Sequence, residues 1–248
     1  MGILDDLMKK AGAKAQNAVQ SGVNQAKNAA RDAVRSGLNA AANGANGGTN
    51  AVKSSPAFQA AQAAEARLNG SGVCVTAGMT AQGYPAVTVS FDALPASLDE
   101  LKACPLADLQ LPYGTAALTV AALNRWEEDR AQTHAMVNFL RGPRPMSPME
   151  EQFIRDRLSG KMYVIRSYWA GTSPQNGYTP EIPYAVTFFE DPYTWQNAGY
   201  CRLNCVSSGA DSPRQITLRK KESTGEWFLW ENYLLPDIRV PAEADPWA

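Results

Sequence analysis

The clearest pattern of hydrophobic and polar positions lies near the C-terminal end, where two alternating segments flank a turn. In residues 214–233, Ile216 and Leu218 occupy one set of alternate positions, polar side chains occupy the other, and a second apolar run follows Gly225. Alternation with a period of two is typical of a half-buried strand, and a short loop that ends in glycine favours a hairpin. This segment therefore predicts two antiparallel strands joined by a tight turn.

A different pattern occupies the leader, residues 1–55, where small apolar residues recur every eleven positions. The rows are Leu4, Ala15, Ala26 and Gly37; Met8, Val19, Ala30 and Ala41; and Val23, Val34 and Ala45. Eleven residues correspond to three helical turns, so such a stripe stays on one side of a long helix. Gly12, Gly22 and Gly37 each disfavour that helix by about 1 kcal/mol relative to alanine. We expect a marginal amphipathic helix that is ordered mainly when its apolar face is covered.

Two kinds of surface can cover this stripe. The basic charge of the leader and the bulky residues near its start favour weak contact with an anionic membrane, whereas the small side chains favour a partner helix or self-association. The contact residues that we expect are Ile3, Leu4, Leu7, Met8, Val19, Val23 and Val34. The alternative is a low-complexity tail that is disordered in solution. The sequence NGANGG at residues 43–48 predicts a flexible joint after the helix.

Helical patterns come next along the chain, and a run of short strands follows them. We expect helices at residues 56–68, 98–104, 115–126, 127–140 and 147–158, with 115–126 and 127–140 forming one long helix or two abutting ones. We expect strands at residues 73–76, 86–91, 162–169, 183–190 and 200–206 and in the hairpin. Ser55, Ser97 and Ser147 are the expected caps of three of these helices. This order predicts an α+β fold with an antiparallel sheet of roughly five to seven strands, preceded by the long amphipathic helix. The expected parts are the leader at 1–55, a connecting helix at 56–70, a globular domain at 72–241 and a tail at 242–248.

Charge divides the chain in the same way. The 248 residues carry a net charge of −1, but the leader has seven basic residues against three acidic ones, a net +4, so the remainder carries −5. This balance does not indicate nucleic-acid binding, and we expect no nucleic-acid partner. No secretory signal, myristoylation pattern or membrane-spanning run of ~20 apolar residues is recognisable. We expect a cytoplasmic protein with reduced thiols, located at the inner membrane face if the leader binds lipid.

Candidate catalytic and metal-binding residues are few, and each has a simpler structural interpretation. Cys201 and Cys205 alternate with polar residues and are separated by about 13 Å of strand, too far for a disulfide or a shared zinc ion, so we expect buried thiols. His134 falls on a polar stripe of its helix and is expected at the surface. The acidic clusters at 127–129 and 150–151 stand near helix starts, where they interact favourably with the helix dipole. We expect no catalytic residue, no metal and no cofactor.

The least ordinary feature of the body is a set of aromatic residues in expected loops. Tyr178 lies in a long loop, and Tyr193 and Trp195 lie in the next turn. Such residues can form a rim that binds a peptide or sugar, or they can fold under the loops as a small satellite core. On the hairpin, Arg214 and Arg219 can contact an anion or an acidic partner, or they can keep an exposed strand face solvated.

Several C-terminal segments resemble an uncharacterised domain family of bacterial proteins. These segments are SGADSPR at 208–214, TLRKK at 217–221, GEWFLWE at 225–231, LLPDIRVP at 234–241 and the closing DPWA at 245–248. The resemblance covers the last fifth of the chain. It implies a bacterial intracellular protein, and because the family has no assigned activity it carries over no catalytic residues.

These patterns lead us to expect a non-enzymatic binding or scaffold protein of unknown ligand. Its leader would attach the body to a membrane surface or to a helical partner or assembly. Two alternatives stay open. One is a metal-dependent enzyme that uses acidic clusters such as Glu127 and Glu128, and the other is a purely structural protein that assembles with itself through the leader.

Overall fold

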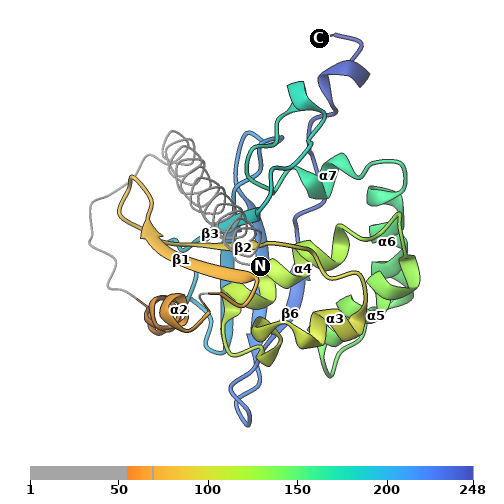
Figure 1. Ribbon diagram of the computed structural model, residues 1–248. Coiled ribbons are helices and arrows are strands. Elements are labelled where there is room, and N and C mark those ends of the chain that lie inside the picture. Colours follow the sequence, from red (N-terminus) through yellow and green to blue (C-terminus); the bar gives the residue numbers. More distant parts are fainter. Residues whose placement is uncertain (1–54, 69, 248) are drawn as a thin grey trace, which may run out of the picture.

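A six-stranded antiparallel sheet forms the centre of the computed structural model, which describes residues 55–68 and 70–247 (Figure 1). The strands are β1 (Val73–Met79), β2 (Pro85–Phe91), β3 (Tyr184–Phe189), β4 (Tyr200–Cys205), β5 (Arg214–Lys220) and β6 (Trp227–Asn232). Each strand pairs with its neighbour in the sequence, so the sheet is a meander. The predicted α+β architecture is confirmed, as is the hairpin that forms β5 and β6. The expected leader helix lies outside the described residues.

One face of the sheet is apolar because successive strands present their hydrophobic side chains on the same side. Val89 lies opposite Val186 in the β2–β3 ladder, and Leu203 lies opposite Ile216 in the β4–β5 ladder. All four side chains are buried in one core cluster. Because side chains alternate between faces along a strand, this register turns short apolar patterns into one continuous surface.

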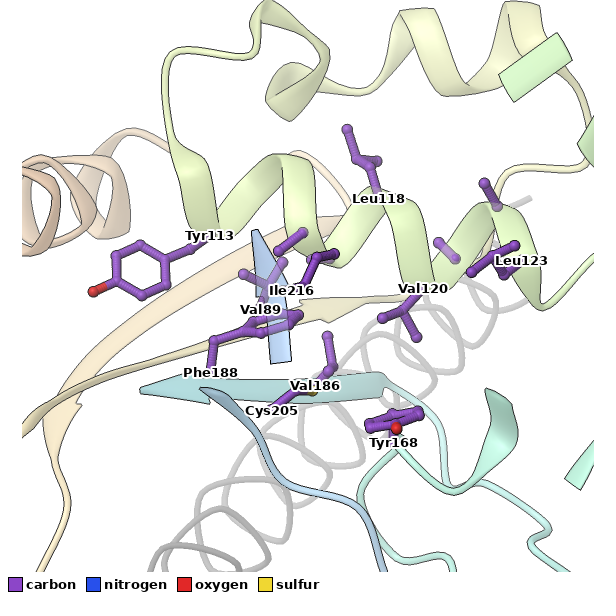
Figure 2. Close-up of a cluster of buried hydrophobic side chains, with 14 of the residues drawn as sticks. Val89, Tyr113, Leu118, Val120, Leu123, Tyr168, Val186, Phe188, Cys205 and Ile216 are labelled. Carbon is purple, nitrogen blue, oxygen red and sulfur yellow. The ribbon is translucent and has the colours of Figure 1, made fainter. Parts of the chain in front are cut away.

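Helix α4 (Pro112–Leu123) covers this surface. Its sequence, PYGTAALTVAAL, contains no charged residue, and every residue in it is buried. Figure 2 shows Val120 pointing toward the sheet and Leu118 pointing away from it, toward the other helices. A helix that is hydrophobic on all sides is typical of a central layer, and α4 lies between the sheet and the outer helices (Figure 2).

The helix starts follow the capping signals of the sequence. The side chain of Ser55 caps α2 (Pro56–Arg67), and Ser147 and Glu150 form a reciprocal capping box at the start of α6 (Pro148–Leu158). Ser97 caps α3 (Leu98–Ala103), and Asp129 caps α5 (Arg130–Arg141). Each cap satisfies a backbone N–H that has no partner within the helix and contributes about 1 kcal/mol.

The strand expected at residues 162–169 is wrong, because the short helix α7 (Tyr163–Arg166) occupies this segment. Val164 and Tyr168 are both buried, at a spacing of four that suits one helical face. The hydroxyl of Ser167 donates a hydrogen bond to the carbonyl oxygen of Val164 at 2.8 Å and stabilises the turn. A short apolar run does not distinguish a buried strand from a buried helical turn.

The remaining described helices are short 3₁₀ turns: η1 (Pro105–Asp108), η2 (Pro174–Asn176) and η3 (Ala242–Ala244). In the described part of the chain, no helix combines the length and apolar character needed to cross a bilayer. Helix α2, expected as a connector, places Ala57, Phe58 and Ala61 in the same core cluster as Val73 and Val75 of β1. It therefore packs as part of the globular body.

Candidate binding site

A pocket of about 250 Å³ lies between α5, α6 and β6, the elements at the centre and right of Figure 1. Its lining combines apolar residues (Val137, Met146, Phe153, Ile154 and Leu229), charged residues (Arg141, Arg144, Glu150 and Glu231) and Trp230, Asn232 and Tyr233. Sites for drug-sized molecules usually enclose roughly 300–1,000 Å³. The pocket is therefore somewhat smaller than a typical site for a drug-sized molecule.

An ion pair fixes the wall of this pocket where α5 ends and α6 begins. The Arg141 side chain is only 4% exposed; its Nη2 donates to Oε1 of Glu150 at 2.7 Å, and its Nε donates to the carbonyl oxygen of Arg144 at 3.0 Å. Burial lowers the pKa of Arg141, while the charge of Glu150 opposes that shift. Burial also disfavours the charged form of Glu150, but hydrogen bonds from Ser147 and the nearby Arg141 and Arg144 outweigh it and hold the pKa of Glu150 below its usual value. The carboxylate of Glu150 is thus committed to a structural role.

Beside the ion pair, two arginines contact one tryptophan ring. The guanidinium carbon of Arg144 lies 4.4 Å from the ring centroid of Trp230, and that of Arg219 lies 4.7 Å from the same centroid. Arg219 also lies over Tyr200 at 5.3 Å, and Tyr200 packs edge-on against Trp230. A guanidinium held against a ring keeps its planar N–H edge available for a carboxylate. Arg144, Arg219, Tyr200 and Trp230 together form the arginine–tryptophan patch. It holds two ordered cations next to the pocket.

The pocket lining and helix α6 expose large apolar side chains. On α6, Met149 is 82% exposed and Phe153, one turn later, is 38% exposed. Tyr233, just after β6, is 52% exposed. Aromatic residues, methionine and arginine are enriched where proteins bind one another. This rim and the pocket together form the best candidate for a binding surface in the described part of the chain.

The aromatic residues that the sequence suggested do not form one rim. Tyr178 is fully buried, and its hydroxyl donates to the carbonyl oxygen of Arg239 at 2.9 Å, so its ring lies inside the core rather than on a loop surface. Trp195 packs edge-on against Trp227. Only Tyr193 is well exposed, at 58%, with Arg202 over its ring. The alternative of aromatics folded beneath loops describes Tyr178 and Trp195.

The two candidate arginines of the hairpin lie in different surroundings. Arg214 donates from Nε to the carbonyl oxygen of Pro236 at 3.1 Å and from Nη2 to that of Asp237 at 2.8 Å, so it fastens the C-terminal loop to β5. Arg219 lies in the arginine–tryptophan patch beside the pocket. A ligand contact by Arg219 stays a prediction. Its guanidinium lies over Trp230, which lines the pocket.

A buried carboxylate that the sequence did not single out joins three segments of the fold. Glu190, 1% exposed, accepts hydrogen bonds at Oε1 from Ser55 Oγ and from the Tyr113 hydroxyl, each at 2.5 Å, and at Oε2 from Trp195 Nε1 at 2.8 Å. The donors come from the start of α2, from α4 and from the loop after β3. A buried carboxylate with three donors is well compensated and typical of a structural anchor. The only signal in the sequence was a glutamate that directly follows an apolar strand.

The acidic clusters stand at helix starts and turns, as expected. Asp129 caps α5, and Glu127 accepts a hydrogen bond from the backbone N–H of Gly160 at 2.6 Å. His134 is partly exposed, with Nε2 at 3.5 Å from Oε2 of Glu151. Within residues 55–68 and 70–247, no group of three or more His, Cys, Asp or Glu side chains is arranged to hold a metal ion.

The two thiols on β4 are buried, as predicted. Cys201 and Cys205 are 0% exposed, on the face of the sheet that α4 covers. Burial raises the pKa of both thiols well above the ordinary value, and the charge of Glu190 adds to this shift at Cys201. A protonated, inaccessible thiol is inert, so these cysteines act as small apolar core residues.

Comparison with known proteins places these features in a family. A family model described as a domain of unknown function, DUF6935, matches residues 93–242, which include the pocket, the arginine–tryptophan patch and Glu190 but not α2, β1 or β2. Neither the curated proteins nor the solved structures gave a match. Because the matched segment is more than half of the chain, the protein belongs to the DUF6935 family of domains of unknown function.

Proposed function

We propose that this protein is a non-enzymatic binding protein whose body accepts an apolar side chain of a protein partner in the pocket between α5, α6 and β6. The observation that carries the proposal is a small, partly apolar pocket with exposed Phe153 and Tyr233 in its lining and exposed Met149 one turn before Phe153 on α6. Interfaces concentrate their binding energy in a few anchors that enter such pockets. The pocket is too small for most cofactors but adequate for one leucine or phenylalanine side chain.

The polar surroundings favour an acidic partner segment. Glu150 is committed to Arg141, whereas Arg144 and Arg219 are held against Trp230. The Arg144 side chain is 50% exposed, and its closest carboxylate is Glu150 at 3.7 Å. A carboxylate next to the apolar anchor would therefore gain a charge-assisted contact with a cation that is already ordered.

The leader provides the second half of the proposed function. Its eleven-residue stripe attaches the body to an anionic membrane surface or to a helical partner, which would concentrate the pocket at one place in the cell. The small side chains of the stripe and the basic charge of the leader support this part of the proposal.

The pocket can be tested by panning a phage library of random peptides on the full chain. Selected peptides should share an apolar residue beside an acidic one, and they should bind at least about tenfold more weakly to the variants Arg144→Glu and Phe153→Asp. Arg155→Glu, an exposed change on α6 outside the pocket lining, is the control and should leave binding unchanged. Peptides that bind all variants equally would show that the pocket is not the site.

The leader can be tested by flotation with vesicles that contain phosphatidylglycerol. We expect the full chain to float and the Leu4→Asp/Leu7→Asp variant to stay in the soluble fraction, because the apolar tip then becomes charged. Asn17→Asp/Asn28→Asp makes the same charge change on the polar side of the stripe and should still float. If the unchanged protein does not float, the membrane attachment is wrong, and sedimentation at increasing concentration then tests the helical partner.

A further inference from the structure

The three strands at the N-terminal edge of the sheet have an unusual outer face. None of the residues in β1, β2 and β3 is charged. The side chains that point away from the core include Cys74, Thr76, Ala86, Thr88, Ser90, Ala185, Thr187 and Phe189, here called the outer sheet face. A sheet face in contact with water is normally polar, and charged residues often protect an edge strand such as β1 from association. On β4 and β5 the same side does carry charge, at Arg202 and Arg219.

Hydroxyl groups on the outer sheet face pair with one another. The hydroxyls of Thr88 and Thr187, which lie opposite each other in the β2–β3 ladder, are 2.8 Å apart. Burying a pair of hydroxyls costs little free energy when they already form a hydrogen bond with each other. Apart from Phe189 at one end, the other side chains are small, so a covering helix could approach closely over most of the face. The described helices do not use this face, since their buried side chains join the core cluster on the other side.

We propose that the leader of the same chain docks on the outer sheet face through its stripe of small apolar residues. The leader joins the body at Ser55, and Ser55 is held in place by its hydrogen bond to Glu190 at 2.5 Å. Helix α2, which follows Ser55, packs against the edge strand β1 on the core side. Residues 43–54 would connect the docked leader to Ser55, and these twelve residues span at most about 40 Å when extended. The path around β1, from the layer of α2 to the opposite side of the sheet, is roughly 20 Å, so the connection is long enough.

Size and charge also match this occupant. Val19 and Val34, at the two ends of the central stripe, would be about 22 Å apart in a helix, comparable with the length of roughly 20 Å of the seven-residue strands β1 and β2. The leader carries +4 and the rest of the chain −5, so the two parts attract each other. Docking rests on the same stripe as the proposed membrane attachment, and the two contacts exclude each other. The leader is thus held on the body until lipid or a helical partner takes it.

Cys74 provides a built-in reporter for this contact. It lies on β1 opposite Ser90, on the same side as Thr76, whose hydroxyl oxygen is 3.9 Å from its sulfur. Its thiol is half-buried, whereas Cys201 and Cys205 are inaccessible in the core. In the full chain carrying Cys104→Ser, the reaction with Ellman's reagent therefore reports on Cys74 alone.

The test compares two leader variants in this background. Val19→Asp/Val23→Asp/Val34→Asp places charge on the stripe and should raise the rate of Cys74 modification by about tenfold or more, because the leader leaves the sheet. Asn17→Asp/Asn28→Asp/Asn39→Asp adds the same charge on the opposite side of the expected helix and should leave the rate unchanged. An equal rate in the stripe variant and the unchanged leader would overturn the proposal. A rate that rises on dilution would also overturn it, because the cover would then come from a second copy.

Vesicles separate this inference from the proposed function. Adding phosphatidylglycerol vesicles to the unchanged leader should raise the Cys74 rate toward that of the stripe variant. If flotation fails but the difference between the two leader variants persists, membrane attachment is wrong and docking stands. If flotation succeeds and the stripe variant reacts at the unchanged rate, docking is wrong and membrane attachment stands.

Discussion

Replacing Tyr113 by phenylalanine tests how strongly the Glu190 carboxylate joins the helices to the sheet. The substitution removes one oxygen atom and keeps the aromatic ring, which is fully buried on α4 (Figure 2). Its hydroxyl donates to Oε1 of Glu190 at 2.5 Å, with the Ser55 hydroxyl on the same oxygen. The variant therefore leaves a buried carboxylate with two donors in place of three.

The expected loss follows from the kind of hydrogen bond that is removed. A hydrogen bond to a charged group contributes about 1.5–3 kcal/mol to the free energy of unfolding. No cavity term of note is added, because the ring remains and only the oxygen is lost. For a chain of this size, each kcal/mol corresponds to roughly 2–4 °C, so the melting temperature should fall by about 3–12 °C.

Urea unfolding followed by tryptophan fluorescence measures the change, with the slope m as a check that the unfolded surface is unaltered. Tyr233→Phe is the matched control, because its ring is 52% exposed, and it should change stability by less than about 0.5 kcal/mol. If Tyr113→Phe and Tyr233→Phe have the same urea midpoint as the unchanged protein, the Glu190 carboxylate does not anchor α4, and the reasoning fails.

Three further predictions concern the core and the turn at the pocket. Cys201 and Cys205 should stay unmodified by Ellman's reagent in the folded protein and react fully in denaturant; rapid modification of the folded protein at either position would contradict their burial. Burial raises the pKa of both thiols and of Tyr113, so the folded chain keeps these protons at a pH where the unfolded chain has lost them. The urea midpoint should therefore not depend on these groups below about pH 9 and should fall above it. A midpoint that stays constant up to about pH 10.5 would contradict this direction. Gly142→Ala should destabilise the protein by about 1–3 kcal/mol more than Gly160→Ala. Both glycines have positive φ, but only at Gly142 would a Cβ lie 2.4 Å from the Phe228 ring. Equal melting temperatures of the two variants would refute this clash.

Local patterns predicted much of the fold because they act over a few residues. The caps at Ser55 and Ser147 and the hairpin of β5 and β6 follow from neighbouring residues and the period of the apolar positions. The strand predicted at residues 162–169 was wrong for the same reason. The apolar residues of this segment fit both a strand and a helical turn, and only packing against the rest of the protein decides between them.

The candidate site could not be predicted in this way, because its parts are distant in the sequence. Val137 of α5 and Tyr233 after β6 line the same pocket, and Glu190 binds residues that are 77 and 135 positions away from it in the sequence. Arg219 was singled out for its charge, but its place against Trp230 depends on the register of the hairpin. Tyr178 was singled out as a loop aromatic, and its burial depends on the C-terminal loop that covers it.

The pairing of β2 with β3 matters for any fragment made from the family boundaries. Six residue pairs, from Ala86–Phe189 to Phe91–Tyr184, join these strands, yet the family match begins at residue 93. A recombinant piece cut at that boundary would leave one side of β3 with unpaired amide and carbonyl groups and would lose the serine donor to Glu190. Such an open edge promotes aggregation and strand exchange between molecules, so a well-behaved fragment should begin no later than Ser55.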